Sequence, residues 1–137
     1  MTYIDTSALV KLFRTEFQSS ALRAYLSQEA SSARLAASAL VLAELPRALL
    51  RAGVAVSVQT AASRFLAGRI LTVSVSDDLL RASGKLSDPG LRTLDAIHIE
   101  TALKLGSLAA FLTYDGKMAH AAAAVGLPVN HPGGLAA

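Results

Sequence analysis

Two hydrophobic patterns alternate along the chain. Short apolar or β-branched runs such as Ile70–Val75 are typical of buried strands, and longer segments with apolar residues three or four positions apart are typical of helices. Because strands alternate with helices throughout, the pattern predicts a parallel sheet with helices on both faces. Strands are predicted at 1–5, 35–37, 70–75, 109–113 and 127–129, and helices at 8–13, 17–30, 38–52, 56–67, 77–86, 92–105 and 116–124.

Individual residues mark the expected helix boundaries. Thr6 or Ser7 is expected to cap the first helix, and Ser76 is expected to cap the helix predicted at 77–86. In each case a hydroxyl oxygen can accept a hydrogen bond from a free amide of the first turn. Gly53 and Gly68 are expected to end two helices, since glycine readily adopts the backbone conformation that closes a helix.

Composition limits the class of protein. At 137 residues, 53% hydrophobic and 17% charged, the chain is predicted to fold as one domain over residues 1–130 with a flexible tail over 131–137. It has no cysteine, which excludes disulfides and cysteine-based sites and suits a reducing compartment. No basic leader is visible, and Glu44 and Pro46 interrupt the longest apolar region, so a cytoplasmic protein without a membrane span is expected.

Four carboxylates stand in or directly after apolar segments: Asp5 in TYIDTSAL, Glu44 in SALVLAEL, Asp95 in LRTLDAIHI and Asp115 in FLTYDG. Burying an isolated carboxylate costs several kcal/mol, roughly, unless a partner or a cation compensates. Each acid also has an ordinary explanation. Asp5 can cap a helix, Glu44 can face solvent, and Asp95 can stabilise the start of its helix. Asp115 before Gly116 is a common turn pair.

Their joint placement is more informative. Asp5 and Asp115 each follow a predicted strand, and ligand sites in open α/β sheets form outside the carboxyl ends of strands. Glu44 and Asp95 lie on helices that begin near the same edge. Carboxylate oxygens are the ligands that Mg²⁺ and Mn²⁺ prefer, and a cation held there activates water against a phosphodiester. The sequence therefore predicts a metal site at this edge.

Charge favours a polyanionic partner. Apart from the four acids, six acidic residues face thirteen lysines and arginines, so the rest of the surface is strongly basic. Ordinary arginine-rich helices explain the same count equally well.

At these residues the chain resembles the PIN-domain nucleases, and among them the VapC-type toxins. YIDTSALVKLF, SALVLAELPRAL, LRTLDAIHIETAL and FLTYDGKMAHAAAAVGLPV resemble the family's four motifs in order and spacing, over nearly the whole chain. The resemblance implies an α/β fold, a three-layer α/β/α PIN-like sandwich with a central, mainly parallel sheet. It also implies that Asp5, Glu44, Asp95 and Asp115 are the catalytic and metal-binding residues, with Thr6 and Thr113 as neighbours able to bond a metal water or a phosphate.

The resemblance further implies a function. The expected protein is a Mg²⁺-dependent endoribonuclease toxin of a type II toxin–antitoxin system, with Mn²⁺ able to substitute. It hydrolyses RNA phosphodiester bonds by a metal-activated water and leaves a 5′-phosphate and a 3′-hydroxyl. The expected partners are the RNA substrate, a VapB-like antitoxin and a second copy of the chain in a homodimer.

Other polar residues of these motifs are secondary candidates. Arg92, one turn before Asp95, is the first candidate to grip a substrate phosphate, and Lys117 is the second. His98 is expected to be packed or hydrogen-bonded rather than to bind metal, and Glu100 is expected to face solvent. Arg47 and Arg51 share one helix face where RNA or an antitoxin can bind.

The sequence also bears on three rival functions. A haloacid-dehalogenase-like phosphatase needs a second acid two residues after its nucleophile, and Ser7 occupies that position. A P-loop enzyme is excluded because the chain has no GxxxxGK[ST] motif. A catalytically silent PIN-like RNA- or protein-binding module is the alternative, although concentrated negative charge beside phosphates disfavours pure binding.

Overall fold

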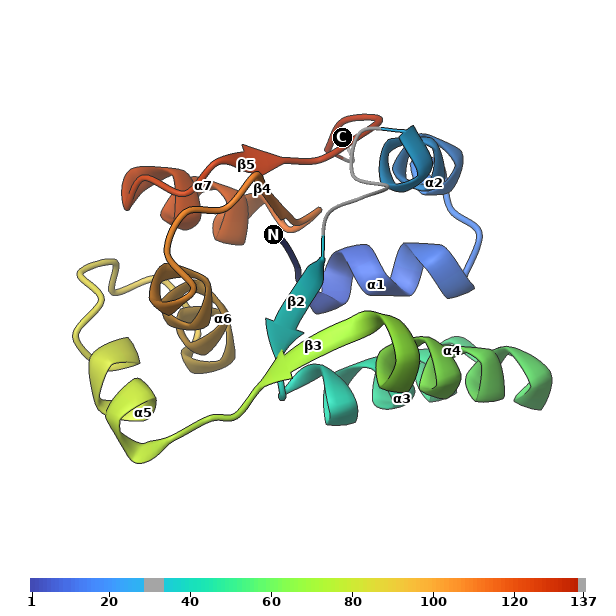
Figure 1. Cartoon of the computed structure of the whole chain (residues 1–137), viewed down its shortest axis with the longest axis horizontal. Coiled ribbons are helices and arrows are strands. Elements are labelled where there is room, and N and C mark those ends of the chain that lie inside the picture. The colour runs from blue at the N-terminus through green and yellow to red at the C-terminus, as the bar shows by residue number, and fades with distance from the viewer. Residues whose placement is uncertain (29–33, 136–137) are drawn as a thin grey trace.

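The computed structural model describes residues 1–28 and 34–135, which form a three-layer sandwich with one parallel sheet in the middle (Figure 1). The strand order is β3-β2-β1-β4-β5, and each neighbouring pair is parallel. The predicted α/β/α fold class is therefore confirmed. The strands are β1 (Thr2–Ile4), β2 (Leu35–Ser38), β3 (Ile70–Val73), β4 (Ala110–Leu112) and β5 (Val129–Asn130).

The strand order reverses at β1. From β1 the chain moves outwards through β2 to β3, and it then crosses back to β4 and β5 on the other side of β1. In parallel sheets a crevice forms at such a reversal, outside the carboxyl ends of the two strands that flank it. These strands are β1 and β4, and the Asp5 amide donates a 3.1 Å hydrogen bond to the Leu112 carbonyl across them.

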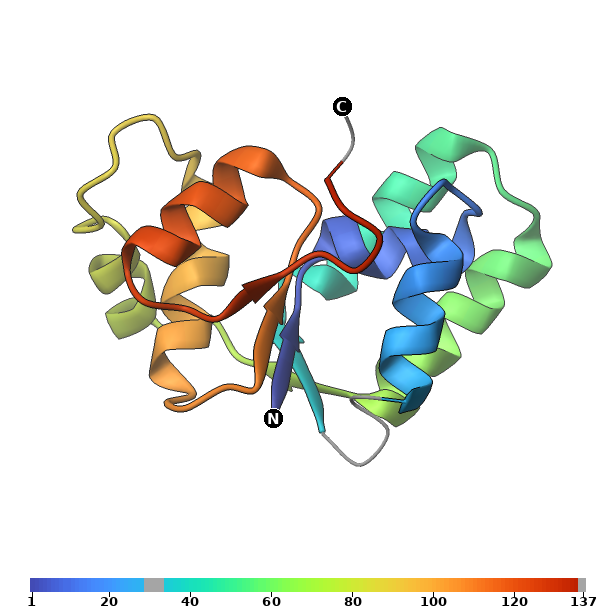
Figure 2. The ribbon, with the colours of Figure 1, turned by 90° about the horizontal axis from the view of Figure 1, so that it is seen from above.

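The helices divide between the two faces of the sheet. Two perpendicular views place α1 to α4 on one side and α5 to α7 on the other (Figure 1 and Figure 2). Across residues 1–28 and 34–135, no helix is both long and apolar enough to cross a membrane. The helices are α1 (Thr6–Phe13), α2 (Ser19–Gln28), α3 (Val41–Ala52), α4 (Val56–Arg69), α5 (Asp77–Ser83), α6 (Thr93–Lys104) and α7 (Gly116–Ala124).

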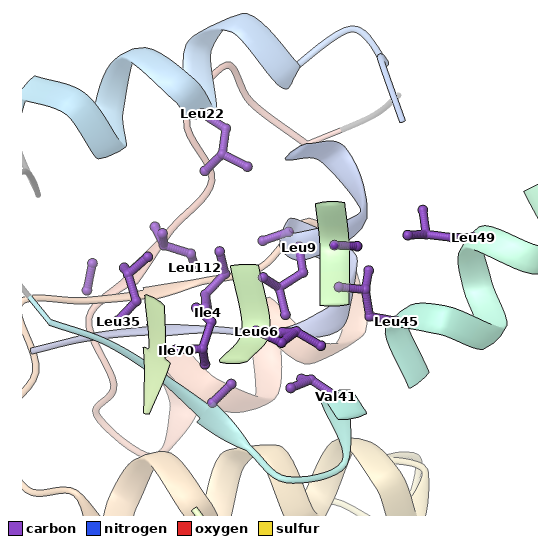
Figure 3. Packing of buried hydrophobic residues seen from close by; sticks show 14 residues of the cluster. Ile4, Leu9, Leu22, Leu35, Val41, Leu45, Leu49, Leu66, Ile70 and Leu112 are labelled. Atoms are coloured by element: carbon purple, nitrogen blue, oxygen red, sulfur yellow. The ribbon is translucent and has the colours of Figure 1, made fainter. Parts of the chain in front are cut away.

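The two faces bury different side chains, because successive residues of a strand point to opposite sides. Ile4 of β1 packs into an aliphatic cluster with Leu9 and Leu45 from α1 and α3 (Figure 3). Each fully buried side chain of this kind contributes about 1.5–3 kcal/mol of transfer free energy. On the other face the ring of Tyr3 stacks on Phe111, with 5.0 Å between ring centroids, beneath α6 and α7.

The helix boundaries follow the predictions at Gly53 and Ser76 and depart from them at Gly68. Gly53 ends α3 with a φ of 69°, a left-handed conformation that favours glycine, as predicted. The prediction that Gly68 ends its helix is wrong, since α4 continues to Arg69 and β3 begins at the next residue. Ser76 caps α5 as predicted, with its hydroxyl accepting from the Leu79 amide.

The segment after β5 lies against the rest of the protein. The Tyr114 hydroxyl donates to the Pro132 carbonyl at 2.7 Å, and Gln18 Nε2 donates to the Gly134 carbonyl at 3.2 Å. The division into a domain over 1–130 and a flexible tail over 131–137 stays a prediction. Residues 136–137 of that tail lie outside the described residues, as do residues 29–30 of the predicted second helix.

Candidate active site

Asp5 lies directly after β1 and is 2% exposed. Its Oδ1 accepts from the Ala8 amide at 3.0 Å and from the Ser7 hydroxyl at 2.7 Å. Asp5 is therefore the cap of α1, and the prediction that Thr6 or Ser7 caps this helix is wrong. Burial raises the pKa of the Asp5 carboxyl above its usual value, against the opposing hydrogen bonds from Thr113 and Ser7.

Glu44 reaches the same place from α3. Its Oε1 accepts from the Thr6 hydroxyl at 2.8 Å and lies 2.7 Å from His98 Nε2 of α6. Partial burial acts to raise the pKa of Glu44, but the combined interactions with His98, Thr6 and Arg92 outweigh it and lower the pKa below its usual value. We call Asp5 and Glu44 the inner pair, because neighbouring residues of α1 hold both of them.

Asp95 and Asp115 both contact the positively charged side chain of Arg92. The Arg92 guanidinium contacts Asp95 Oδ2 through Nε at 3.1 Å and Asp115 Oδ2 through Nη2 at 3.5 Å. Asp115 also caps α7, since its Oδ1 accepts from the Met118 amide at 3.0 Å. The hydrogen bond and the charge of Asp95 raise the pKa of the exposed Arg92. We call Asp95 and Asp115 the outer pair.

Two hydroxyls join the ends of β1 and β4. Ser7 Oγ lies 3.3 Å from Thr113 Oγ1, and it also accepts from the Tyr114 amide at 2.9 Å. Thr113 is completely buried and accepts from the Asp115 amide at 3.2 Å. These bonds connect the loop that carries Asp5 to the loop that carries Asp115, so the two carboxyl ends of the strands form one rim.

The four predicted acids thus reach one edge of the sheet from four separate segments. Within the described ranges, however, no group of three or more histidine, cysteine, aspartate or glutamate side chains has the spacing of a ready-made metal site. Hydroxyls and His98 hold the inner pair, and Arg92 holds the outer pair. The role of these acids as metal ligands stays a prediction.

The donor chemistry fits a hard divalent cation. All four candidate ligands offer carboxylate oxygens, and Mg²⁺ is usually bound through one or two carboxylates with several retained waters. The outer pair already forms ion pairs with a positively charged group, the guanidinium of Arg92. The buried Asp5 carboxylate, whose ionisation is disfavoured by burial, would be stabilised by a nearby cation.

Secondary candidates lie in different surroundings. Arg92 is at the rim but pairs with acids, and Lys117 is exposed just beyond Asp115.

His98 is packed and hydrogen-bonded, as expected, yet its partner is Glu44, a contact that sequence patterns did not indicate. The sequence predicted a possible capping role for Ser7, but not its hydrogen bond to Asp5. The exposed Arg47 and Arg51 on α3, and the half-buried Glu100 on α6, make no ion pair in the described part of the chain.

Comparison with known proteins identifies a matching family model and similar sequences. The PIN domain family model matches residues 2–124, a range that contains all four acids. Ribonuclease VapC46 from Mycobacterium tuberculosis (strain ATCC 25618 / H37Rv) is 43% identical over 131 residues, which cover 95% of this chain and 96% of the relative. Ribonuclease VapC35 from the same strain is 38% identical over 137 residues, covering 97% of this chain and 98% of the relative.

Two solved structures share the fold. The crystal structure of Mycobacterium tuberculosis VapC20, described as a sarcin-ricin loop cleaving toxin, has a TM-score of 0.77 at 18% identity and covers 96% of this chain and all of its own. The structure of VapBC2 from Rickettsia felis, bound to a DNA fragment from their promoter, has a TM-score of 0.72 at 20% identity, covering 96% and 99%. With a family model over most of its length and relatives above 30% identity, the chain belongs to the PIN domain family and, within it, to the VapC group of ribonucleases.

Proposed function

We propose that this chain is the endoribonuclease toxin of a type II toxin–antitoxin pair, and that it hydrolyses RNA phosphodiester bonds with Mg²⁺, or Mn²⁺ in its place. The observation that carries the proposal is the meeting of four carboxylates at the carboxyl edge of β1 and β4, in a chain 43% identical to a ribonuclease. A protein that only bound RNA would gain nothing from negative charge where phosphates approach.

The proposed metal ligands are Asp5, Glu44, Asp95 and Asp115. A divalent cation bound there would polarise a phosphodiester and lower the pKa of a water molecule beside it. The fit rests on the oxygen donors and on the shared edge described above. The inner pair is already held in fixed orientations by hydrogen bonds, whereas the outer pair needs Arg92 to move aside.

The chain's own residues supply orientation and charge. Ser7 donates to Asp5 and so fixes one carboxylate oxygen beside the helix terminus. Arg92, whose side chain is 76% exposed, can exchange its carboxylate partners for the oxygens of an RNA phosphate, with which guanidinium groups form charge-assisted hydrogen bonds. This exchange would unite the predicted phosphate contact of Arg92 with the ion pairs observed in the structure.

We also propose the partners that the family relationship suggests. These are RNA as substrate, a VapB-like antitoxin that covers the site, and a second copy of the chain in a homodimer that acts in the cytoplasm. The Rickettsia felis neighbour, solved as VapBC2, supports an antitoxin partner through its shared fold. Light scattering of the purified chain, alone and with the product of an adjacent reading frame, would measure both assemblies.

The function is tested by incubating the purified chain with a mixture of structured RNAs. We expect cleavage with Mg²⁺ or Mn²⁺, none with EDTA, and products that carry 5′-phosphate ends. Asp95→Asn should remove most of the cleavage, whereas Asp78→Asn, an exposed aspartate on α5 paired with Arg81 at 3.2 Å, should not. Undiminished cleavage in EDTA would contradict the metal-dependent reaction, and RNA binding without any cleavage would favour the silent module.

A further inference from the structure

A chain of buried hydrogen bonds runs from the sheet to Glu44. The Ser38 amide at the end of β2 donates to the Tyr3 hydroxyl at 3.1 Å, and this hydroxyl lies 2.6 Å from His98 Nδ1. The other ring nitrogen of His98, Nε2, lies 2.7 Å from Glu44 Oε1. Ser38 and Tyr3 are completely buried and His98 is 2% exposed, so water does not compete with the hydrogen bonds among these three residues.

The donors along this chain set its direction. A backbone amide can only donate, so the Tyr3 oxygen accepts from Ser38 and its own proton must point elsewhere. Among the described residues, His98 Nδ1 is the acceptor in hydrogen-bond contact with that hydroxyl. A tyrosine hydroxyl carries one proton that it can donate, so the Tyr3 hydroxyl donates to His98 Nδ1.

This direction fixes the tautomer of His98. A ring nitrogen that accepts a hydrogen bond carries no proton, so Nδ1 is bare and the proton of the neutral ring is on Nε2. His98 Nε2–H therefore donates to Glu44 Oε1. Thr6 donates to the same oxygen at 2.8 Å, from α1. In the described part of the chain Glu44 Oε2 has no hydrogen-bond partner, so it is the oxygen available to a ligand.

We propose that Tyr3 and His98 are positioning residues that hold the Glu44 carboxylate in one orientation, with Oε1 bound to the protein and Oε2 presented to the active site. Rotation of this carboxylate would break both the Thr6 and the His98 bond. The consequence for catalysis rests on the proposed function, whereas the tautomer and the direction of the hydrogen bonds do not. Replacing a residue that orients a metal ligand without itself binding the metal typically changes metal affinity or activity about 10–100-fold.

The tautomer is tested first, by NMR of the side-chain nitrogens in the metal-free protein. Long-range ¹H–¹⁵N spectra should show His98 with a protonated Nε2 and an unprotonated Nδ1; the His98 signals are those that vanish in His98→Gln. Tyr3→Phe should shift the Nδ1 resonance, and Glu44→Gln should shift Nε2. A proton on Nδ1, or an Nδ1 resonance unchanged in Tyr3→Phe, would overturn the proposal.

The positioning role is tested by two amides of different reach. His98→Asn places an amide near the position of Nδ1, so it keeps a partner for Tyr3 but falls short of Glu44. His98→Gln carries its NH₂ group near the position of Nε2, so it keeps the donor to Glu44 and leaves Tyr3 without its acceptor. We expect Mn²⁺ affinity, measured by calorimetry, to fall about 10–100-fold in His98→Asn and by much less in His98→Gln.

Matched controls separate positioning from general damage. His120→Gln on the exposed face of α7 and Tyr25→Phe on α2 make the same chemical changes away from the site and should leave Mn²⁺ affinity unchanged. Equal losses in His98→Asn and His98→Gln, with both proteins folded, would show a purely structural role and overturn the proposal. A wild-type chain that neither binds Mn²⁺ nor cleaves RNA would instead overturn the proposed function, and the NMR shifts would still decide how Glu44 is held.

Discussion

The inner and outer pairs of acids lie at one edge of the same sheet but are held by different chemistry. Uncharged hydroxyls of α1, a backbone amide and His98 hold the inner pair through short hydrogen bonds. A single exposed arginine holds the outer pair, in contacts of 3.1 and 3.5 Å. Asp5 is 2% exposed, whereas the side chains of Glu44, Asp95 and Asp115 are 24%, 15% and 32% exposed, so the two pairs differ in their partners more than in their exposure.

This difference separates a fixed half of the site from an adjustable half. The bonds of the inner pair form within and between packed elements, so its geometry exists before any ligand arrives. The partner of the outer pair is an exposed ion pair, whose net contribution to stability is typically about 0–1 kcal/mol. A cation can therefore compete for the outer pair, and a phosphate for Arg92, at little cost in free energy. The orientation of the inner pair is already fixed before such a ligand binds.

The largest effect is expected from the inner pair. Asp5→Asn should reduce RNA cleavage by about 10²–10³-fold, the range for loss of one preorganised electrostatic group. The asparagine oxygen can still accept from the Ala8 amide, so α1 keeps its cap and the protein should fold. Initial cleavage rates at saturating Mn²⁺ measure the effect.

The matching change in the outer pair sharpens the comparison. Asp115→Asn also keeps its cap, to the Met118 amide, but its site is more exposed and Asp95 stays beside Arg92. We expect a loss of about 10–100-fold, smaller than that of Asp5→Asn. Equal losses in the two variants would remove the distinction between a fixed and an adjustable half.

A further prediction concerns the free energy of unfolding of Asp5→Asn in the absence of metal. The pKa of Asp5 is raised by burial, so its neutral form contributes stability that is complete below the unperturbed value of 3.8 and is lost as pH rises through the folded value. At pH 7 burial of this carboxyl group costs free energy that a neutral asparagine avoids. Asp5→Asn should therefore be more stable by about 0.5–2 kcal/mol at pH 7, and the gain should vanish as pH falls towards 4.

Urea denaturation of both proteins in EDTA, repeated between pH 4 and pH 7, measures this difference. A variant less stable than the wild type at pH 7 would mean that the hydrogen bonds from Ser7 and Thr113 more than offset the cost of burial. If the less active Asp5→Asn variant is the more stable protein, Asp5 is kept for function at the expense of stability.

Glu44→Gln is expected to change the stability of the protein in the opposite direction to Asp5→Asn. The pKa of Glu44 is lowered, so its charged form contributes stability above the unperturbed value of 4.5 that is lost as pH falls through the folded value. Glu44→Gln should be less stable than the wild type at pH 7 by about 1 kcal/mol, the usual net value of a hydrogen bond. The same denaturation measurements, extended below pH 4, should show the stabilities of the two proteins converging as pH falls, and a constant difference at every pH would contradict the prediction.

Much of this architecture was predictable from local sequence, because strand and helix patterns depend on residues a few positions apart. Those patterns predicted the parallel sheet and placed Asp5 and Asp115 beyond the carboxyl ends of β1 and β4. Gly68 was misread because a glycine inside a helix looks locally like one that ends it. Asp5, rather than Thr6 or Ser7, caps α1 because the helix begins at Thr6, two residues before its predicted start at residue 8.

The partners of the acids were less predictable, because they depend on how distant elements pack. His98 and Glu44 are 54 residues apart, and Tyr3 and His98 are 95 residues apart. Only the packing of α3 and α6 beside β1 and β2 brings these groups within hydrogen-bond distance. The bridging role of Arg92 has the same origin, since its contact with Asp95 is local but its contact with Asp115 joins α6 to α7.

The smallest expected effect tests the adjustable half directly. If Arg92 competes with a divalent cation for the outer pair, Arg92→Ala should raise Mn²⁺ affinity by about 1.5- to 5-fold, which corresponds to the 0.2–1 kcal/mol of an exposed ion pair. Arg81→Ala is the matched control, because Arg81 is 70% exposed and pairs with Asp78 at the same i,i+3 spacing and 3.2 Å. Calorimetry should show no change in this control.

The same variant should lose RNA affinity although it gains Mn²⁺ affinity, because Arg92 is also the proposed phosphate contact. Adding salt should narrow both differences, since exposed charges are screened within about 10 Å at 0.1 M ionic strength. If Arg92→Ala weakened Mn²⁺ binding instead, the guanidinium would be organising Asp95 and Asp115 for the cation rather than competing with it. The outer pair would then be as fixed as the inner pair, with a cationic side chain in place of hydroxyls and a histidine.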